Sequence, residues 1–207
     1  TVEEGDTLVT GTDAAAQVRM EDGGLVALRP DTRMKVDSFR FDGKQDGTEQ
    51  YLVSLFKGGF RAITGLIGRL HKESYRITTP TATIGIRGTD YALMLCTDKD
   101  DTCQGLNVPP EFRASHKTLP AGLYLAEFEG TINVSNKAGS KDFSEGQFGY
   151  VRDDQTPPQA LSDDPGLARE FPTLGNLPGT LSPFGGASGA CAKNCSKAAI
   201  ALAMSPE

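Results

Sequence analysis

Four cysteines in two close pairs are the residues of this chain whose spacing says most about chemistry. Cys96 and Cys103 have six residues between them, and Cys191 and Cys195 have three. Neither spacing fits a zinc finger or a zinc ribbon, so disulfides are favoured over a metal site. Two local bridges, Cys96–Cys103 and Cys191–Cys195, are the preferred pairing, and a cross-link from the tail to the body is the alternative. Disulfides would place the protein outside the cytosol, in the periplasm or beyond.

Acidic residues and histidines offer weaker candidates. Asp98, Asp100 and Asp101 could form a calcium cluster, but the Gly and Glu positions of a calcium-binding loop are missing, which favours a solvated acidic loop tip. His71 and His116 lie near neither cysteine pair, and the sequence has no Gly-x-Ser-x-Gly motif for a serine nucleophile. Both histidines are therefore interpreted as surface residues rather than bases.

Glu127 and Glu129 would share one face of a predicted strand. Two such carboxylates could serve glycoside hydrolysis, although a solvent-facing strand shows the same pattern more often. We therefore expect a protein that is not an enzyme, with no catalytic residue, no metal ion and no cofactor.

Composition narrows the class of protein further. The chain has 207 residues and a formal net charge of −6, and no basic cluster of the kind that binds nucleic acid is visible. The apolar run 198–204 is far shorter than the roughly 20 residues of a membrane-spanning helix, so we expect no transmembrane segment. No signal peptide is found at Thr1, and we expect either that one was removed or that the chain is a fragment.

Short strand-like runs recur about every eight to ten residues and predict an all-β fold. Several runs alternate cleanly between apolar and polar residues, as half-buried strands do. In one run the alternation breaks, because Met34 and Val36 fall on one parity whereas Phe39 and Phe41 fall on the other. An inserted residue reverses the facing side, so we predict a β-bulge or bend near 37–38.

Residues 1–151 are predicted to form one β-domain. Residues 64–74 would be a connection within it, because Gly65 and Gly68 weaken the helical spacing of their leucines. A loop insertion is predicted at 97–122, with the Cys96–Cys103 bridge at its base.

Residues 152–207 are predicted to form an extended Pro/Gly-rich C-terminal arm that ends in a short helix over 191–204. A purely disordered tail seldom carries so many large apolar residues. The arm should therefore pack on its own domain or on a neighbouring subunit. Its candidate contacts are Leu167, Phe171, Leu174, Leu177 and Phe184.

The stretch Tyr75-Arg-Ile-Thr-Thr-Pro-Thr-Ala-Thr-Ile-Gly-Ile-Arg-Gly-Thr-Asp-Tyr91 resembles the hallmark of FecR-type domains. Earlier segments fit the same family in the expected order, and the resemblance covers roughly 1–151. It implies a twisted, β-solenoid-like stack of short strands, with a β-sandwich as the alternative. The structural signature positions are Gly5, Asp6, Asp22, Gly23, Gly58, Pro80, Gly85, Arg87, Gly88, Thr89 and Asp90.

Arg87 and Asp90 flank the turn at Gly88 and Thr89. They could read a partner, but an Arg and an Asp three residues apart can also satisfy the polar groups of a tight turn. The second interpretation is preferred, and it predicts that Asp90→Ala harms folding more than any activity.

The resemblance also implies a function. The best-known FecR-like proteins lie in the periplasm of Gram-negative bacteria, where they pass a signal from a TonB-dependent transporter through a membrane helix to a sigma factor. This sequence shows no sigma-binding segment, membrane helix or signalling subdomain. It is therefore similar to stand-alone exported FecR-domain proteins, which implies protein–protein contacts in the periplasm, at the outer-membrane surface or outside the cell.

Two alternatives belong to other classes. The chain could be a structural subunit of an envelope or extracellular assembly, in which the C-terminal arm links neighbouring copies by strand addition. It could also bind envelope glycans through Tyr51, Tyr75 and Tyr91 if these rings align, although core tyrosines are the preferred interpretation.

Overall fold

The computed structural model describes residues 1–43, 46–98, 102–171, 174 and 199–204. Within these ranges the fold is almost entirely β, and no helix is long and apolar enough to cross a membrane. The strands are β1 (Thr7–Val9), β2 (Ala14–Arg19), β3 (Leu25–Leu28), β4 (Arg33–Arg40), β5 (Gln50–Ile63), β6 (Tyr75–Thr78), β7 (Thr83–Ile86), β8 (Asp90–Cys96), β9 (Gly122–Glu129), β10 (Thr131–Asn136), β11 (Gly139–Ser144), β12 (Phe148–Val151), β13 (Gln159–Leu161) and β14 (Ala199–Met204). The short helices are α1 (Leu66–Leu70), η1 (Lys72–Ser74), α2 (Pro110–Arg113) and α3 (Leu167–Glu170).

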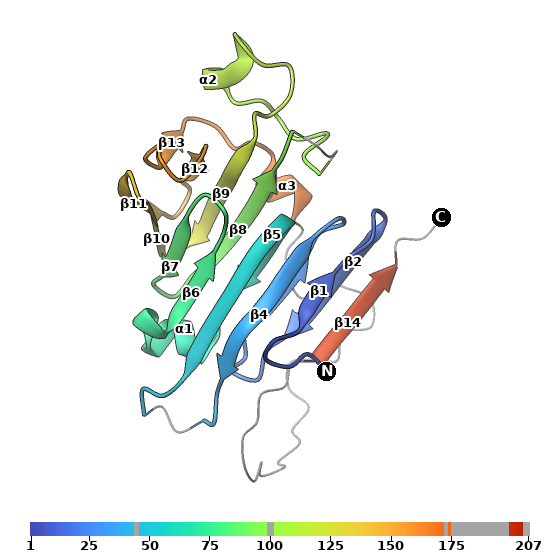
Figure 1. The fold of residues 1–207 in the computed structure, drawn as a ribbon, viewed down its shortest axis with the longest axis vertical. Coiled ribbons are helices and arrows are strands. Elements are labelled where there is room, and N and C mark those ends of the chain that lie inside the picture. The colour runs from blue at the N-terminus through green and yellow to red at the C-terminus, as the bar shows by residue number, and fades with distance from the viewer. Residues whose placement is uncertain (44–45, 99–101, 172–173, 175–198, 205–207) are drawn as a thin grey trace.

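The strands form one connected sheet of 14 strands, and the long strand β5 joins its two parts (Figure 1). The N-terminal part of β5 pairs with β4 and β6, and its C-terminal part pairs with β3 and β8. We call β1, β4, β6, β7, β10 and β11 with the start of β5 the first half-sheet. The second half-sheet contains β14, β2, β3, β8, β9, β12 and β13 with the end of β5.

Gly58 is the point at which β5 passes from one half-sheet to the other. Its φ is +75°, and a Cβ there would lie 2.5 Å from the hydroxyl oxygen of Thr32. That hydroxyl donates to the carbonyl of Gly59 at 2.9 Å and accepts from its N–H at 3.0 Å. The sequence predicts two strands here, 51–56 and 59–63, whereas the structure has one bent strand, because the glycines allow pairing to continue through the bend.

The predicted fold class is confirmed, since the molecule is all-β and its short strands form a twisted sheet. The chain visits the two half-sheets alternately, with β2 and β3 in the second, β6 and β7 in the first, β8 and β9 in the second, and β10 and β11 in the first. The bulge predicted near 37–38 is also confirmed. Val36 pairs with Val53 and Ser38 with Leu52, so Asp37 is the extra residue.

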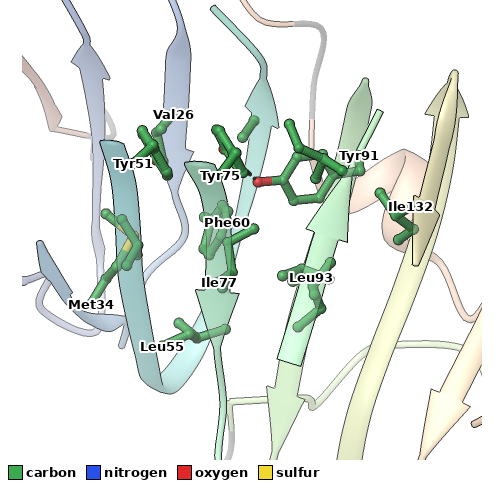
Figure 2. Packing of buried hydrophobic residues seen from close by; sticks show 14 of the residues in the cluster. Val26, Met34, Tyr51, Leu55, Phe60, Tyr75, Ile77, Tyr91, Leu93 and Ile132 are labelled. Atoms are coloured by element: carbon green, nitrogen blue, oxygen red, sulfur yellow. Dashed lines mark hydrogen bonds between the residues drawn. The ribbon is translucent and has the colours of Figure 1, made fainter. Parts of the chain in front are cut away.

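One core cluster collects buried side chains from both half-sheets (Figure 2). Tyr51 and Tyr75 stack at its centre with ring centroids 4.1 Å apart, and the hydroxyl groups of Tyr75 and Tyr91 lie 2.8 Å from each other. Each of these tyrosines is at most 3% exposed. Because the three rings are buried, a glycan cannot reach them. The structure therefore gives no support to glycan binding through Tyr51, Tyr75 and Tyr91.

A second, smaller core covers the outer face of β8, β9 and β12. Leu106 and Leu119 reach it from the insertion at 97–122, and Leu161, Leu167 and Phe171 reach it from the segment after Val151. The Cys96–Cys103 disulfide joins the end of β8 to this insertion. Residues 152–171 thus continue the folded body.

The C-terminal strand is a correction to the helix predicted over 191–204. Residues 199–204 form β14, which pairs antiparallel with β2 from Ala199↔Arg19 to Met204↔Ala14. Alanine favours helices in isolation, but the backbone donors and acceptors of a neighbouring strand edge offset that weak preference.

Candidate functional site

The signature turn at residues 85–90 is anchored in the body by its own backbone. The N–H of Thr89 donates to the hydroxyl of Thr64 at 2.9 Å, and the N–H of Thr64 donates to the carbonyl of Thr89 at 2.9 Å. Helix α1 begins two residues after Thr64. The turn and the helix are therefore held as one unit.

Asp22, a signature position distant in sequence, fixes the start of α1. Its buried carboxylate accepts the N–H of Gly24 at 3.0 Å and that of Ile67 at 3.3 Å, and its carbonyl accepts the N–H of Leu66. A Cβ on Gly65 would lie 2.3 Å from the carboxyl carbon, so only glycine fits there. Burial raises the pKa of Asp22, and these N–H donors offset part of that rise.

Asp90 closes the signature turn and forms an ion pair with Arg61. Nε and Nη2 of Arg61 donate to the two carboxylate oxygens at 2.8 and 2.7 Å. The side chains are 11% and 15% exposed. The same guanidinium donates to the carbonyl of Phe171 at 3.0 Å and lies 4.3 Å from the ring centroid of Phe128. Asp90 therefore has a structural role, but it acts through Arg61 of β5 and not through the polar groups of its own turn.

Phe171 is where this ion pair meets the segment after Val151. It is buried, and the guanidinium of Arg29 lies 5.6 Å from the centroid of its ring. Arg29 also pairs with the carboxylate of Glu170 at 2.6 Å. Arg29 and Arg61 thus both contact the end of α3 and hold it against the second half-sheet.

Glu127 lies beside the same network but points into the core. It is fully buried, and neither carboxylate oxygen has a hydrogen-bond partner. Burial, aided by the charge of Asp90, raises its pKa to about 9. The expected carboxylate pair is absent, because a bulge at Phe128 pairs Glu127 with Tyr91 and leaves Glu129 exposed opposite Asp90. Two carboxylates on opposite sides of a strand cannot share one substrate.

Arg87 differs from Asp90 because it faces solvent. Arg76 is exposed on β6 opposite Gly85, so it is the diagonal neighbour of Arg87. Arg69 is exposed on α1, with its Cγ 3.7 Å from where a Cβ on Gly88 would lie. None of these three guanidinium groups has a hydrogen bond or ion pair to another described residue.

Leu66 and Leu70 lie on α1 next to Arg69, at helical spacings that share one face. They are 39% and 50% exposed, whereas Ile67 and Gly68 face the core. We call Leu66, Arg69, Leu70, Arg76 and Arg87 the arginine–leucine patch. The sequence analysis identified Arg87 but missed the rest, because the glycines of 64–74 concealed the helix that presents the leucines.

The remaining signature positions serve backbone geometry. Gly5, Gly23 and Gly88 have φ angles of +91°, +86° and +67°, which favour glycine. Asp6 accepts the N–H of Glu3 at 2.8 Å. Pro80 lies exposed in the turn between β6 and β7.

Other candidate residues are scattered or lie outside the described residues. Leu167 and Phe171 are buried against the second half-sheet and Leu174 is half-buried, whereas Leu177, Phe184, Cys191 and Cys195 fall outside the described ranges. Asp98 lies beyond β8, and its two acidic neighbours at 100 and 101 are also outside. The described residues contain no group of His, Cys, Asp or Glu that could hold a metal ion.

Comparison with known proteins shows what this architecture is similar to. The family model described as FecR protein matches residues 6–105. Two crystal structures of a proposed anti-sigma factor from Parabacteroides distasonis ATCC 8503, at 1.65 and 2.50 Å, have the same fold, with TM-scores of 0.53 and 0.52 and 13% sequence identity. The alignment covers 78% of this chain and 61% of that protein, so the chain spans less than two thirds of its length. No curated protein matches the chain significantly.

Proposed function

We propose that this chain, whose residues 6–105 match the FecR protein family model, is a FecR-like regulatory protein that acts through protein–protein contacts outside the cytosol, without catalysis. The observation that carries the proposal is that the two charged residues of the signature turn, Arg87 and Asp90, have different surroundings. Asp90 is paired with Arg61 in the body, whereas Arg87 three residues earlier is exposed. The side chain of Arg69 on α1 lies close to the adjacent Gly88, and Leu66 and Leu70 of the same helix are also exposed. Charged and apolar side chains that are exposed together on a rigid element mark a contact surface.

The Cys96–Cys103 disulfide supports the proposed compartment. Such bonds persist in oxidising compartments and are rare in the cytosol, which supports the periplasm, the outer-membrane surface or the exterior of a Gram-negative bacterium. The site also supports a role without catalysis, because Asp22 caps α1, Arg61 and Asp90 hold the segment at Phe171, and Glu127 is buried in the core away from solvent.

A photo-crosslinking experiment in the native cell envelope tests this function. A photoreactive amino acid in place of Arg87 is expected to give a discrete adduct with another protein, because that side chain lies within a contact surface. The same replacement at Arg40, which is exposed at the end of β4, is the matched control and should give no such adduct. Absence of an adduct at position 87, or the same adduct at both positions, would count against the proposal.

A second candidate function is a structural subunit whose copies exchange their C-terminal strands. The supporting observation is β14, an uncharged strand that pairs with β2 over six residues and follows a long connection after Leu174. Such a strand can be supplied by the same copy or by a neighbour, which is the geometry of strand addition.

Cysteine cross-linking separates the two arrangements, because Ala15 and Ala203 are paired across β2 and β14. One tagged copy would carry Ala15→Cys and a differently tagged copy Ala203→Cys, and both would be expressed together. The structural-subunit function predicts a disulfide between the two tags. Only intrachain bonding in the double variant, with no bond between the single variants, would exclude exchange.

A further inference from the structure

We propose that the arginine–leucine patch binds an acidic, apolar-faced helical segment of a partner protein. This inference rests on the proposed function and adds the chemistry of the partner. It starts from charge, because the chain has a formal net charge of −6 and yet Arg76 is the diagonal neighbour of Arg87, and the side chain of Arg69 lies close to Gly88. Two other surface cations, Lys35 and Lys137, have acidic partners in Asp37 and Asp154, whereas these three arginines have no ion pair to another described residue.

The three cations carry like charges, and no described carboxylate lies within ion-pair distance of them, although the charge of Arg69 offsets part of the rise in the pKa of the buried Asp22. Carboxylates of a ligand would offset these like charges and accept paired hydrogen bonds from each planar guanidinium. Arginine is also the charged residue most enriched where interfaces gain their affinity. The cationic side of the patch therefore fits an acidic ligand.

The leucines add an apolar requirement. The described residues have four strongly exposed large hydrophobic side chains, and Leu66 and Leu70 are two of them. They are one helical turn apart and flank Arg69, so the face alternates between apolar and basic groups. A helix with leucine-like side chains on one face and carboxylates at its margins matches this order.

The patch is also preorganised. The Asp22 carboxylate fixes the first turn of α1, and Gly68 packs so closely on the core that a Cβ there would lie 2.4 Å from Cδ1 of Ile86. Helix α1 thus cannot shift against β7 without disturbing both contacts. A rigid surface loses little conformational entropy when it binds, so even a small patch can have useful affinity.

Overall charge distinguishes this partner from other anions. Nucleic acids and anionic membranes present extended negative surfaces, from which a chain of net charge −6 is repelled as a whole. A short acidic helix contacts only the patch and avoids most of that repulsion. An acidic protein segment is therefore favoured over phosphate-rich surfaces.

The test uses the full chain and a fluorescent 18-residue helical peptide with leucines on one face and glutamates elsewhere. Binding measured by anisotropy should weaken at least about tenfold in Arg87→Glu and in Leu70→Ser. It should also weaken as salt is raised. Arg19→Glu, which makes the same charge change on β2, should bind as the unmodified protein does. Circular dichroism melting would show that each variant is folded.

Three outcomes would overturn the inference: equal binding by the patch variants and the Arg19 control, equal binding of a peptide with lysine in place of glutamate, or preferential binding to phosphatidylglycerol vesicles. The two proposals fail separately. An adduct at position 87 without peptide binding leaves the protein-contact function standing and removes the acidic helix. Peptide binding without any adduct supports the chemistry of the patch and removes the function.

Discussion

Asp90→Ala is expected to lower the free energy of unfolding by about 3 kcal/mol, because it leaves Arg61 as an unpaired, largely buried cation. The guanidinium would keep the carbonyl of Phe171 and the ring of Phe128 as neighbours, but neither neutralises a charge. The loss therefore destabilises the junction between the second half-sheet and α3. Urea denaturation followed by circular dichroism measures the change, and limited proteolysis near Phe171 should be faster in the variant.

A double-mutant cycle controls this prediction. Replacing both partners, as in Asp90→Ala with Arg61→Met, removes the stranded charge and should recover part of the lost stability. Asp154→Ala removes an exposed carboxylate from its pair with Lys137 and should leave the denaturation midpoint unchanged. Additive effects of the two core substitutions would show that the ion pair is not the cause.

The sequence predicted features that depend on the local order of side chains. The parity change between Val36 and Phe39 located the bulge, because side-chain direction in a strand has a period of two. The turn chemistry at Gly88 likewise indicated a structural role for Asp90. For the bulge the information lies within a few residues, whereas Arg61, the partner of Asp90, lies on a distant part of the chain that no local pattern indicates.

Features set by distant contacts were missed for physical reasons. The sequence predicts that Glu127 and Glu129 share one exposed face. The bulge at Phe128 turns Glu127 inward, and that bulge depends on pairing with β8. The helix expected at the C-terminus is a strand because β2 offers a free edge. Leu66 and Leu70 become part of a candidate contact surface only because α1 packs next to the signature turn. No local sequence pattern indicates that packing.

The two charged residues of the signature turn have surroundings other than the turn interpretation supposed, because Asp90 pairs with Arg61 and Arg87 is exposed. Asp90 and Thr89 face the body and satisfy polar groups there. Arg87 has no such role and is exposed on the outer face. Asp90 thus stabilises the fold, whereas Arg87 presents its charge to solvent. We therefore expect substitution of Asp90 to lower stability and substitution of Arg87 to affect binding.

Glu127→Gln is expected to make the protein more stable at neutral and alkaline pH. The pKa of Glu127 is raised from 4.5 to about 9 in the folded protein, so the folded state holds a proton that the unfolded state has released. Its contribution to stability is therefore fully present below pH 4.5 and is lost as the pH rises towards 9. The slope is about 1.4 kcal/mol per pH unit within that window.

Glutamine has the shape of the protonated side chain and does not ionise, so the variant should lack this slope. Urea denaturation at pH 5, 7 and 8.5 gives the difference in unfolding free energy between the variant and the unmodified protein. That difference should grow with pH, because contributions of other groups cancel in it. Glu129→Gln, an exposed change on the same strand, should show no such growth. A pH-independent difference for Glu127→Gln would mean that the carboxyl group is already ionised in the core, which would require a counter-charge or water beside its two unpartnered oxygens.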